Sequence, residues 1–448
     1  MIIVDKALQA RQQAANPIRV GVVGAGFMGQ AVTRQIHSLT AGMTVVAVAN
    51  RTLERAAQAY VGSGVSDVVT VSSKKGLEAA IKRKQPAITD DPLLVCEAEG
   101  IDVILEATST IELAAQVSLS AITHGKHVIL VNAELDGSLG PILKVYADRH
   151  NVTFSTCDGD QPGVEMNLYR YVNMIGLTPL VCGNIKSLLD HYRTPSTQAE
   201  FAATWGQNPV MATSFVDGSK ISFEQAIVAN ATGMSVLKRG MVGVAYEGNV
   251  DEPEHLAHYD IDVLRARGGV VDYTLGATPR PGVFVLAAQD EATPAKAVQI
   301  RNLALFKMGD GPLYCFYTPF HLCYFEAAMT VGRVALFADA CATPLGQPMV
   351  DVVATAKRNL QPGEVLDGIG GYCAYGQCEN ADVSYQDKLL PLAMSQGCLL
   401  KQAVKKDTVI RYDDIELPEG RLSDRLRAEQ NDTFFASAKA STRVATAD

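Results

Sequence analysis

Apolar residues in the first part of the chain fall into two alternating patterns: short continuous runs, and longer segments with apolar residues at helical spacing. The run "RVGVVG" at 19–24 is typical of a buried strand, and "QAVTRQIHSL" at 30–39 is apolar on one helical face. A second apolar run, "MTVVAVAN", follows at 43–50. This order predicts a strand, a helix and a parallel strand, which together form a βαβ unit.

The same alternation continues further along the chain. "IDVILEATST" at 101–110 and "GKHVILVNAELDG" at 125–137 are predicted to be two more parallel strands, joined by the helix "IELAAQVSLSAITH". The intervening residues 53–100 contain helical stretches and a polar surface segment. We therefore expect an α/β protein in which residues 1–160 form a dinucleotide-binding Rossmann domain with a doubly wound parallel sheet.

The remaining chain is expected to form two further regions. Residues 161–345 are predicted to be a central mixed α/β domain for substrate binding and oligomerisation, and residues 346–448 a small β-rich domain. "AKRNLQPGEVL" at 356–366 is a near-repeat of "LKQAVKKDTVI" at 400–410, which indicates two similar β units in the last region. "AAMTVGRVALFADA" at 327–340 is apolar at helical spacing and is expected to be a helix that returns to the first domain.

Composition limits the kinds of partner. The chain has 448 residues, of which 48% are hydrophobic and 19% charged, enough for two or three domains with their own cores. A net charge of -9 and the absence of any basic run longer than "KRK" at 82–84 argue against nucleic acid and membrane surfaces as partners. No apolar stretch reaches about 18 residues and the first residues lack signal-peptide order, so we expect a cytoplasmic protein. The nine cysteines are scattered singly, which indicates reduced thiols.

Three glycines lie between the first predicted strand and its helix, in "GVVGAGFMGQ" at 21–30. Gly24 would allow a tight turn, Gly26 would let the backbone approach a pyrophosphate, and Gly29 would let the helix pack close to the strand. The alternative is a structural glycine turn. Because the loop stands inside a predicted βαβ unit, we expect a dinucleotide site. Its contacts are expected from Gly24, Gly26, Phe27, Met28 and Gly29.

The residues that end the later strands bear on the choice of cofactor. NAD-binding folds usually place Asp or Glu at the end of the second strand, to hold the ribose 2′-hydroxyl. Here the strand ends in Asn50 and Arg51. An arginine suits a 2′-phosphate, so NADPH is expected rather than NADH, although Arg51 could also be a solvated residue at a helix start. Thr108, Asn132 and Glu134 follow later strands, where the nicotinamide is expected to lie.

Two polar stretches in the central region carry candidate chemistry. "CDGDQPG" places Asp158 and Asp160 in a turn, where they could act as acid and base, bind a metal or simply form the turn. "NIKSLLDHYRTPS" contains Lys186, Asp190 and Arg193, together with a histidine. Lysine and arginine there could hold a substrate phosphate, and Lys186 could polarise a carbonyl, although a solvated loop is the alternative.

A third stretch, "PLYCFYTPFHLCYFE", contains a histidine among aromatic and apolar residues. His321 is a candidate for substrate binding, with Glu326 five residues later. The alternative is a histidine that is satisfied within the core.

The motifs resemble those of a known family. "GAGFMG", "AVANR", "EATST" and "GKHVILVNAE" are similar to the nucleotide-binding half of homoserine dehydrogenase, where the last motif continues with Asn-Lys rather than Asn-Ala-Glu. "DGDQPG", "HYRTPST", "YTPFHLCYFE" and "AKRNLQPGEVLDGIGGYCAYG" resemble a branch of that superfamily with a C-terminal SAF-type domain. That branch includes the 1-deoxy-D-xylulose 5-phosphate reductoisomerase-like enzymes.

The resemblance implies a reaction and its site. 1-Deoxy-D-xylulose 5-phosphate would be isomerised and then reduced by NADPH to 2-C-methyl-D-erythritol 4-phosphate, an isoprenoid precursor. Such a rearrangement usually needs a divalent metal such as Mg²⁺ or Mn²⁺, for which Asp160 and Glu134 would be the ligands. Catalysis is expected from Asp160, Lys186, Glu134 and Asp190, and substrate binding from Arg193 and His321. The implied protein is a homodimer that binds a small phosphorylated sugar.

Two other functions fit the same residues. One is an NAD(P)-dependent dehydrogenase of the homoserine dehydrogenase superfamily that acts on another hydroxylated or amino acid substrate, without isomerisation. The other is a non-catalytic NADP-binding sensor. The clustered Asp, Lys and Arg residues outside the cofactor site favour an enzyme, because a sensor has less need of them.

Overall fold

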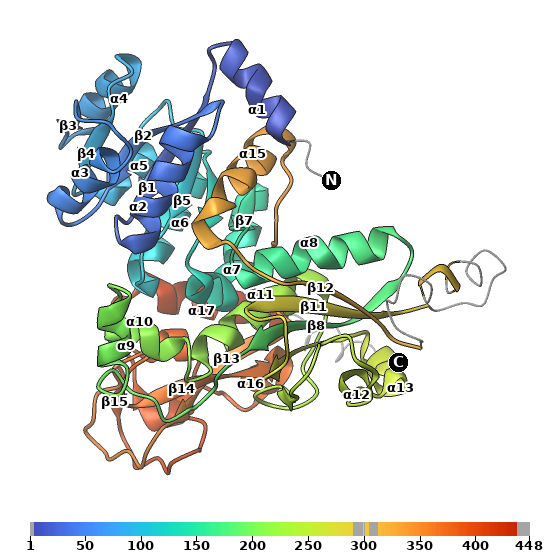
Figure 1. Cartoon of the computed structure of the whole chain (residues 1–448). Coiled ribbons are helices and arrows are strands. Elements are labelled where there is room, and N and C mark those ends of the chain that lie inside the picture. Colours follow the sequence, from blue (N-terminus) through green and yellow to red (C-terminus); the bar gives the residue numbers. More distant parts are fainter. Residues whose placement is uncertain (1–3, 290–298, 300, 304–311, 437–448) are drawn as a thin grey trace, which may run out of the picture. The chain divides into compact units, whose positions relative to one another are not determined.

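The computed structural model describes residues 4–289, 299, 301–303 and 312–436 (Figure 1). The chain divides into two compact units. Unit 1 contains Met1–Asp160 and Leu322–Thr343, and unit 2 contains Gln161–His321 and Pro344–Asp448. None of the described helices is long and apolar enough to cross a membrane.

Unit 1 is built on a seven-stranded parallel sheet with the order β3-β4-β2-β1-β5-β6-β7. The chain leaves β1 toward β2 on one side and later returns to pair β5 on the other, so the carboxyl end of β1 is the switch point of the sheet. The predicted Rossmann-like α/β fold is confirmed. The strands are β1 (Ile18–Val23), β2 (Met43–Ala49), β3 (Val69–Thr70), β4 (Ala87–Thr89), β5 (Val103–Glu106), β6 (His127–Leu130) and β7 (Phe154–Thr156).

Helices pack on this sheet through their apolar faces. Val20 and Val22 of β1 share one buried cluster with Val32 and Ile36, which explains the helical spacing of the apolar residues after the glycine loop. The helices are α1 (Val4–Gln13), α2 (Phe27–Arg34), the π-helical η1 (Gln35–Leu39), α3 (Leu53–Val61), α4 (Lys74–Lys82), α5 (Pro92–Glu97), α6 (Ile111–Thr123) and α7 (Ala133–Arg149).

A helix from the far end of the sequence completes unit 1. The 3₁₀-helical η2 (Cys323–Phe325) leads into α15 (Ala327–Phe337), whose residues Ala327 and Val331 are buried in the same core as β1. Figure 1 shows α15 in orange beside the blue α1, and the two helices are in contact. The predicted return of this segment to the first domain is confirmed.

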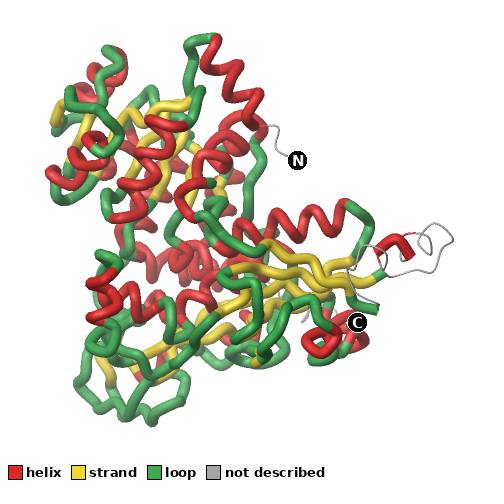
Figure 2. The backbone as a smooth tube through the Cα atoms, in the orientation of Figure 1, coloured by secondary structure: helices red, strands yellow, loops and turns green. Residues whose placement is uncertain are grey.

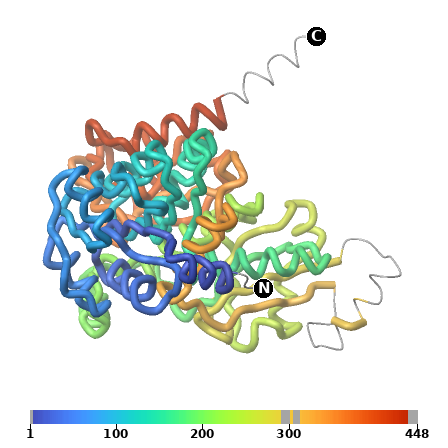
Figure 3. The backbone as a smooth tube through the Cα atoms, turned by 90° about the horizontal axis from the view of Figure 1, so that it is seen from above, coloured from blue at the N-terminus to red at the C-terminus, as the bar shows by residue number. Residues whose placement is uncertain are grey.

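Unit 2 contains a mixed five-stranded sheet with the order β12-β11-β8-β10-β9. β8 pairs parallel with β10 and antiparallel with β11. Figures 2 and 3 both show α8 lying along this sheet, and α8 contacts β8, β11 and β12. The central elements are α8 (Gln161–Met174), β8 (Thr178–Lys186), α9 (Ala199–Thr204), α10 (Pro209–Ser214), α11 (Ser219–Thr232), β9 (Val244–Ala245), α12 (Pro253–Leu256), α13 (Ile261–Arg267), β10 (Val270–Leu275), β11 (Gly282–Ala288) and β12 (Tyr314–Thr318).

The C-terminal part of unit 2 contains two small antiparallel sheets, as the predicted β-rich region requires. It packs with the central part as one unit, because α11 contacts both β13 and β14. Division of the chain into three domains, and the SAF-like character of the last one, stay predictions. The elements are β13 (Val350–Ala356), β14 (Ala374–Asn380), α16 (Ala381–Gln386), η3 (Leu392–Met394), β15 (Leu399–Leu400), η4 (Tyr412–Asp414), β16 (Ile415–Glu416), α17 (Leu422–Asn431) and η5 (Asp432–Ala436).

The two copies of the near-repeat at 356–366 and 400–410 lie antiparallel to each other. Leu360 and Val404, which occupy the same position in the two copies, exchange backbone hydrogen bonds of 2.8 and 3.1 Å. On either side of this pair, a backbone bond from the first copy to the second has a counterpart that runs from the second copy to the first between equivalent positions. The two copies are therefore related by a local pseudo-twofold axis. Two such corresponding bonds are Ala356 N to Thr408 O and Leu400 N to Glu364 O.

The close approach of α2 to the loop after β1 gives a test of the fold. A Cβ atom on Gly29 would lie 1.8 Å from the backbone oxygen of Gly24, whereas one on Gly26 would meet no atom within 4 Å. We expect Gly29→Ala to cost about 1–3 kcal/mol of unfolding free energy through overpacking, and to lower the midpoint of thermal unfolding. Gly26→Ala is the control and should unfold like the parent. Equal midpoints for Gly29→Ala and the parent would contradict this packing.

Candidate functional site

The glycine loop forms an open cradle at the start of α2. Gly24 has a left-handed backbone (φ +99°), and a Cβ on it would lie 2.7 Å from the backbone oxygen of Ala107. Gly26 precedes the first turn of α2 and has open space around the position of a Cβ. The first backbone N–H groups of a helix lack helical partners and attract phosphate. The cradle therefore fits the pyrophosphate of a dinucleotide, and a side chain on Gly26 would fill it.

The end of β2 supports the cradle. The Asn50 side chain accepts a hydrogen bond from the backbone nitrogen of Ala25 (3.0 Å) and donates one to the backbone oxygen of Thr52 (2.9 Å). Asn50 therefore holds the loop rather than presenting free donors. Arg51 is exposed and makes no hydrogen bond or ion pair with the described residues, which leaves its guanidinium available to a ligand.

Polar groups at the ends of β5 and β6 form one network. The backbone nitrogen of Thr108 donates to Oε1 of Glu106 (2.7 Å), and Nδ2 of Asn132 donates to the backbone oxygen of Thr108 (3.1 Å). Asn132 also accepts from the backbone nitrogen of Leu135 and so caps α7. The predicted residues Thr108 and Asn132 are thus brought together. Glu134 is buried in the first turn of α7, where the helix dipole stabilises a carboxylate.

Glu106 was missed by the sequence analysis. It is fully buried, and its second oxygen, Oε2, has no hydrogen-bond partner among the described residues. Burial raises the pKa of Glu106 to about 8, so the carboxyl group is mostly protonated at neutral pH. An acid directly after the apolar residues Val103–Leu105, at the end of "VILE", was the sequence signal that could have identified it.

The turn "CDGD" contains a structural aspartate. Asp158 is buried and forms an ion pair with Arg333 of α15 (3.0 Å), and its backbone nitrogen donates to the hydroxyl of Thr330 (2.7 Å). Asp158 therefore anchors α15 to the end of the sheet. Asp160 lies in the same turn and is partly buried. Among the described residues no group of three or more His, Cys, Asp or Glu side chains is placed to hold a metal, so metal binding by Asp160 and Glu134 stays a prediction.

Lys186 ends β8 and stands in a buried polar network of unit 2. Its Nζ donates to Oε1 of Gln161 (3.1 Å) and lies 3.6 Å from Oε2 of Glu224. The Glu224 carboxylate also accepts from Nδ2 of Asn184 (3.0 Å) and lies 3.9 Å from Nζ of Lys220. The Lys186 side chain keeps 17% of its surface exposed, whereas Glu224 is buried. The network thus holds two lysines whose side chains are partly exposed, Lys186 (17%) and Lys220 (13%), against the buried carboxylate of Glu224.

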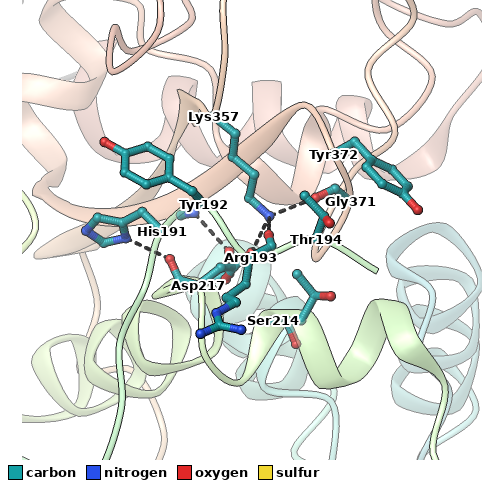
Figure 4. Close-up of polar contacts among 12 residues, drawn as sticks. His191, Tyr192, Arg193, Thr194, Ser214, Asp217, Lys357, Gly371 and Tyr372 are labelled. Carbon is teal, nitrogen blue, oxygen red and sulfur yellow. Dashed lines mark hydrogen bonds and ion pairs between the residues drawn. The ribbon is translucent and has the colours of Figure 1, made fainter. Parts of the chain in front are cut away.

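The predicted residues Asp190 and Arg193 lie in a different network, built around Lys357 (Figure 4). Arg193 Nε donates to Asp190 (3.0 Å). Lys357 is buried, and its ammonium group contacts Asp217 Oδ2 (2.9 Å) and the backbone oxygens of Arg193 (2.8 Å) and Gly371 (2.7 Å). These three contacts match the three donors of a lysine, so Lys357 is a structural cation that joins the three segments.

His191 belongs to the same network. Its Nδ1 lies 2.7 Å from the backbone oxygen of Asp217, and its ring stacks on Tyr375 with centroids 4.2 Å apart. Because a carbonyl only accepts, Nδ1 carries the proton in this bond. Figure 4 shows the histidine beside Tyr192, with this bond to Asp217. His191 is therefore held in one orientation, although it was not among the expected site residues.

His321 and Glu326 fall in different units. His321 is partly buried and follows β12 in unit 2, and Glu326 precedes α15 in unit 1. Burial, together with the nearby Asp158, raises the pKa of Glu326. Most of the expected site residues are thus distributed over three sets of contacts: the cradle with the ends of β2, β5 and β6, the Lys186 network, and the Lys357 network. Asp160, in the turn after β7, and His321, after β12, lie outside these sets as described.

Two families match parts of the chain. Residues 24–150 match the family described as homoserine dehydrogenase, NAD binding domain, and residues 159–327 match the family described as oxidoreductase DRL, catalytic domain. Inositol 2-dehydrogenase 4 of Saccharopolyspora erythraea is 39% identical over 98 residues, which are 21% of this chain and 29% of that protein. The chain therefore matches less than a third of the length of this curated relative.

Solved structures show a more distant similarity. A protein described as a probable dehydrogenase from Thermotoga maritima has 12% identity and a TM-score of 0.39, over 73% of this chain and 91% of that chain. The scyllo-inositol dehydrogenase of Lactobacillus casei, solved with NAD(H) and scyllo-inositol, has 17% identity and a TM-score of 0.32, over 61% and 66%. Similarity at this level says nothing about the substrate of this chain.

These findings correct the expected reaction. The matching families are a homoserine dehydrogenase NAD-binding domain and an oxidoreductase catalytic domain, and the curated relative is a dehydrogenase, so the assignment as a 1-deoxy-D-xylulose 5-phosphate reductoisomerase is wrong. The physical reason is that the glycine spacing and the strand ends are imposed by a bound dinucleotide, whatever substrate is turned over. A phosphorylated substrate and a homodimer stay untested. The chain is an NAD(P)-dependent oxidoreductase.

The buried carboxyl group of Glu106 gives a pH-dependent test. Its pKa is about 8 in the folded chain against an ordinary value of 4.5, so the folded state binds more protons and loses stability as the pH rises between these values. Glu106→Gln keeps an acceptor for Thr108 and removes the titration. We expect the unfolding free energy of the variant to rise relative to that of the parent by up to about 1.4 kcal/mol for each pH unit between these pKa values. Urea unfolding at several pH values measures this difference. A difference that does not change with pH would refute the shifted pKa.

Proposed function

We propose that the protein is a dehydrogenase that interconverts a hydroxyl group and a carbonyl group on an uncharged sugar-like or polyol substrate, with NADP preferred over NAD. The observation that carries the proposal is the placement of Lys186, a lysine with a partly exposed side chain whose ammonium group is held by a buried carboxylate and a carboxamide.

The cofactor side of the proposal depends on unit 1. Gly24, Gly26 and Gly29 would hold the pyrophosphate at the start of α2, and Arg51 would meet a 2′-phosphate. When bound, the nicotinamide supplies or accepts the hydride. Support for NADP comes from the exposed guanidinium of Arg51, which has no partner in the described part of the chain, and from the sequence Asn50-Arg51 at the end of β2, which lacks a carboxylate.

Lys186 is suited to the proton that accompanies hydride transfer. Oxidation of an alcohol moves a hydride to the cofactor and a proton to a base, and reduction of a carbonyl requires the same proton in return. A neutral Nζ of Lys186 would accept the hydroxyl proton, and a charged Nζ would donate it to the carbonyl oxygen. Glu224 and Gln161 fix the amine, and the carboxylate compensates the charge of the protonated form.

The charges of unit 2 favour an uncharged substrate. All three donors of Lys357 are used by Asp217, Arg193 and Gly371, and Arg193 is paired with Asp190. The donors of Lys357 are therefore occupied within the chain, which weakens the case for a phosphate site at that lysine. The partial similarity to an inositol dehydrogenase supports a polyhydroxylated substrate.

The decisive experiment measures NADP⁺ and NAD⁺ reduction with a panel of inositols, sugar alcohols and aldoses, and with homoserine as the amino acid alternative. We expect turnover of a polyol or sugar. Lys186→Met should lower kcat by about 100-fold or more with an unchanged Kd for NADPH, because it removes the proton donor and acceptor. Lys388→Met, at an exposed lysine of unit 2, is the matched control. Turnover of homoserine alone would refute the substrate class, and full activity of Lys186→Met would refute the role of the lysine.

Cofactor preference is a separate prediction. We expect the parent to bind NADPH more tightly than NADH, and Arg51→Asp to reduce or reverse the ratio of the two Kd values, because it replaces a cation with a carboxylate that suits a ribose 2′-hydroxyl. Fluorescence titration with both cofactors gives the ratio. The exposed Arg55 on α3 provides the control variant Arg55→Asp. Equal affinity of the parent for both cofactors would show that Arg51 does not select between them.

A further inference from the structure

A short segment from the far end of the sequence lies beside the cofactor cradle. Residues 322–326, which we call the aromatic strap, follow unit 2 in the sequence but belong to unit 1. The strap contains η2 and runs directly into α15, which is buried in the core of the Rossmann sheet. Its position relative to the cradle is therefore set within a single unit.

One contact fixes the strap to the turn that follows β7. The backbone nitrogen of Cys323 donates to the backbone oxygen of Gly159 (2.6 Å). Gly159 has a left-handed backbone (φ +84°), and a Cβ on it would lie 2.2 Å from the backbone oxygen of Cys323. Only glycine allows this approach, so the turn in "CDGDQPG" is shaped to receive the strap.

A second contact joins the strap to the glycine loop. Tyr324 meets Phe27, the first residue of α2, edge to face with ring centroids 6.1 Å apart and planes at 78°. Tyr324 also packs against the core of unit 1, and the ring of Phe325 stacks on it with centroids 4.4 Å apart. Three aromatic rings thus extend from the cradle along the strap.

Much of this aromatic surface is open to solvent. Phe27 is 60% exposed, Phe325 51% and Leu322 42%. The Tyr324 hydroxyl has no hydrogen-bond partner among the described residues. A group of exposed apolar side chains around an unused hydroxyl is typical of a surface that a ligand covers, because covering it removes apolar area from water.

The sheet order shows which part of the dinucleotide lies on this side. Arg51 follows β2, on one side of β1, and that side holds the adenosine ribose. The strap joins the loop after β1 to the turn after β7, across the side that holds β5, β6 and β7. In a doubly wound sheet this second side holds the nicotinamide half of the cofactor.

We propose that the aromatic strap is part of the NAD(P) site, in which its rings cover the nicotinamide mononucleotide half and the Tyr324 hydroxyl donates a hydrogen bond to that half. The inference deepens the proposed function and rests on its cofactor site, not on its substrate. A strap that only anchors α15 would have no effect on the cofactor.

Binding of the whole cofactor and of one half tests this assignment. Kd values are measured for NADPH by fluorescence titration and for 2′,5′-ADP, which lacks the nicotinamide half, by calorimetry. Tyr324→Phe removes one hydroxyl and keeps the ring, so we expect NADPH to bind about 5-fold more weakly, as for one lost hydrogen bond, with 2′,5′-ADP unchanged. Tyr171→Phe, at an exposed tyrosine on α8 of unit 2, is the matched control.

A second variant tests the aromatic cover. Phe325→Ser should weaken the binding of NADPH and leave the binding of 2′,5′-ADP unchanged. Phe337→Ser, at an exposed phenylalanine of α15, should change neither. Unchanged NADPH affinity in Tyr324→Phe and Phe325→Ser, or equal weakening of NADPH and 2′,5′-ADP, would overturn the strap as a nicotinamide contact and leave the proposed function intact. A parent that does not bind NADPH would overturn both proposals.

Discussion

The packing of backbone against backbone at the carboxyl end of β1 is the constraint on which the cofactor site depends. Gly29 lies so close to the carbonyl oxygen of Gly24 that no side chain fits between helix and loop. Because of this approach, α2 begins directly after Gly26, and its unpaired N–H groups point to the switch point of the sheet. The hydrogen bond from Ala25 to Asn50 then fixes the loop against β2. The cradle is therefore mainly a property of the backbone.

Unit 2 uses buried charge where unit 1 uses close backbone packing. Lys357 is held by Asp217 and by two backbone oxygens from segments far apart in the sequence, so removing the Asp217 carboxylate would leave an uncompensated buried charge. These contacts of Lys357 favour one arrangement of the loops that they join. The loop that contains His191 and Arg193 is thereby fixed to the start of α11 and to the C-terminal β region.

Much of the fold could be predicted from the sequence, because periodic apolar patterns report local structure. The parallel strands, the glycine loop and helix α15 follow from apolar residues at strand or helix spacing, although α15 packs on β1, which is far from it in the sequence. The site was harder. Asp158 and Asp160 look alike in "CDGDQPG", yet Asp158 pairs with Arg333, more than 170 positions away, and no local pattern contains that information. The substrate was the most difficult property to predict, because the motifs shared with known families belong to the cofactor site.

Three ionisable residues at the ends of mostly apolar strands differ in how their charge is compensated. Glu106 ends β5, Lys186 ends β8, and Lys357 comes directly after β13, each after a run of mostly apolar residues. Burying an ionisable group at such a place costs several kcal/mol unless it is neutralised or paired, so it persists only where a partner or a function compensates. Glu106 is neutralised by protonation, Lys357 is paired completely, and Lys186 alone keeps part of its surface in solvent. The same sequence feature therefore has three outcomes: an acid neutralised by protonation, a lysine whose donors are all used within the chain, and a lysine whose side chain stays partly exposed.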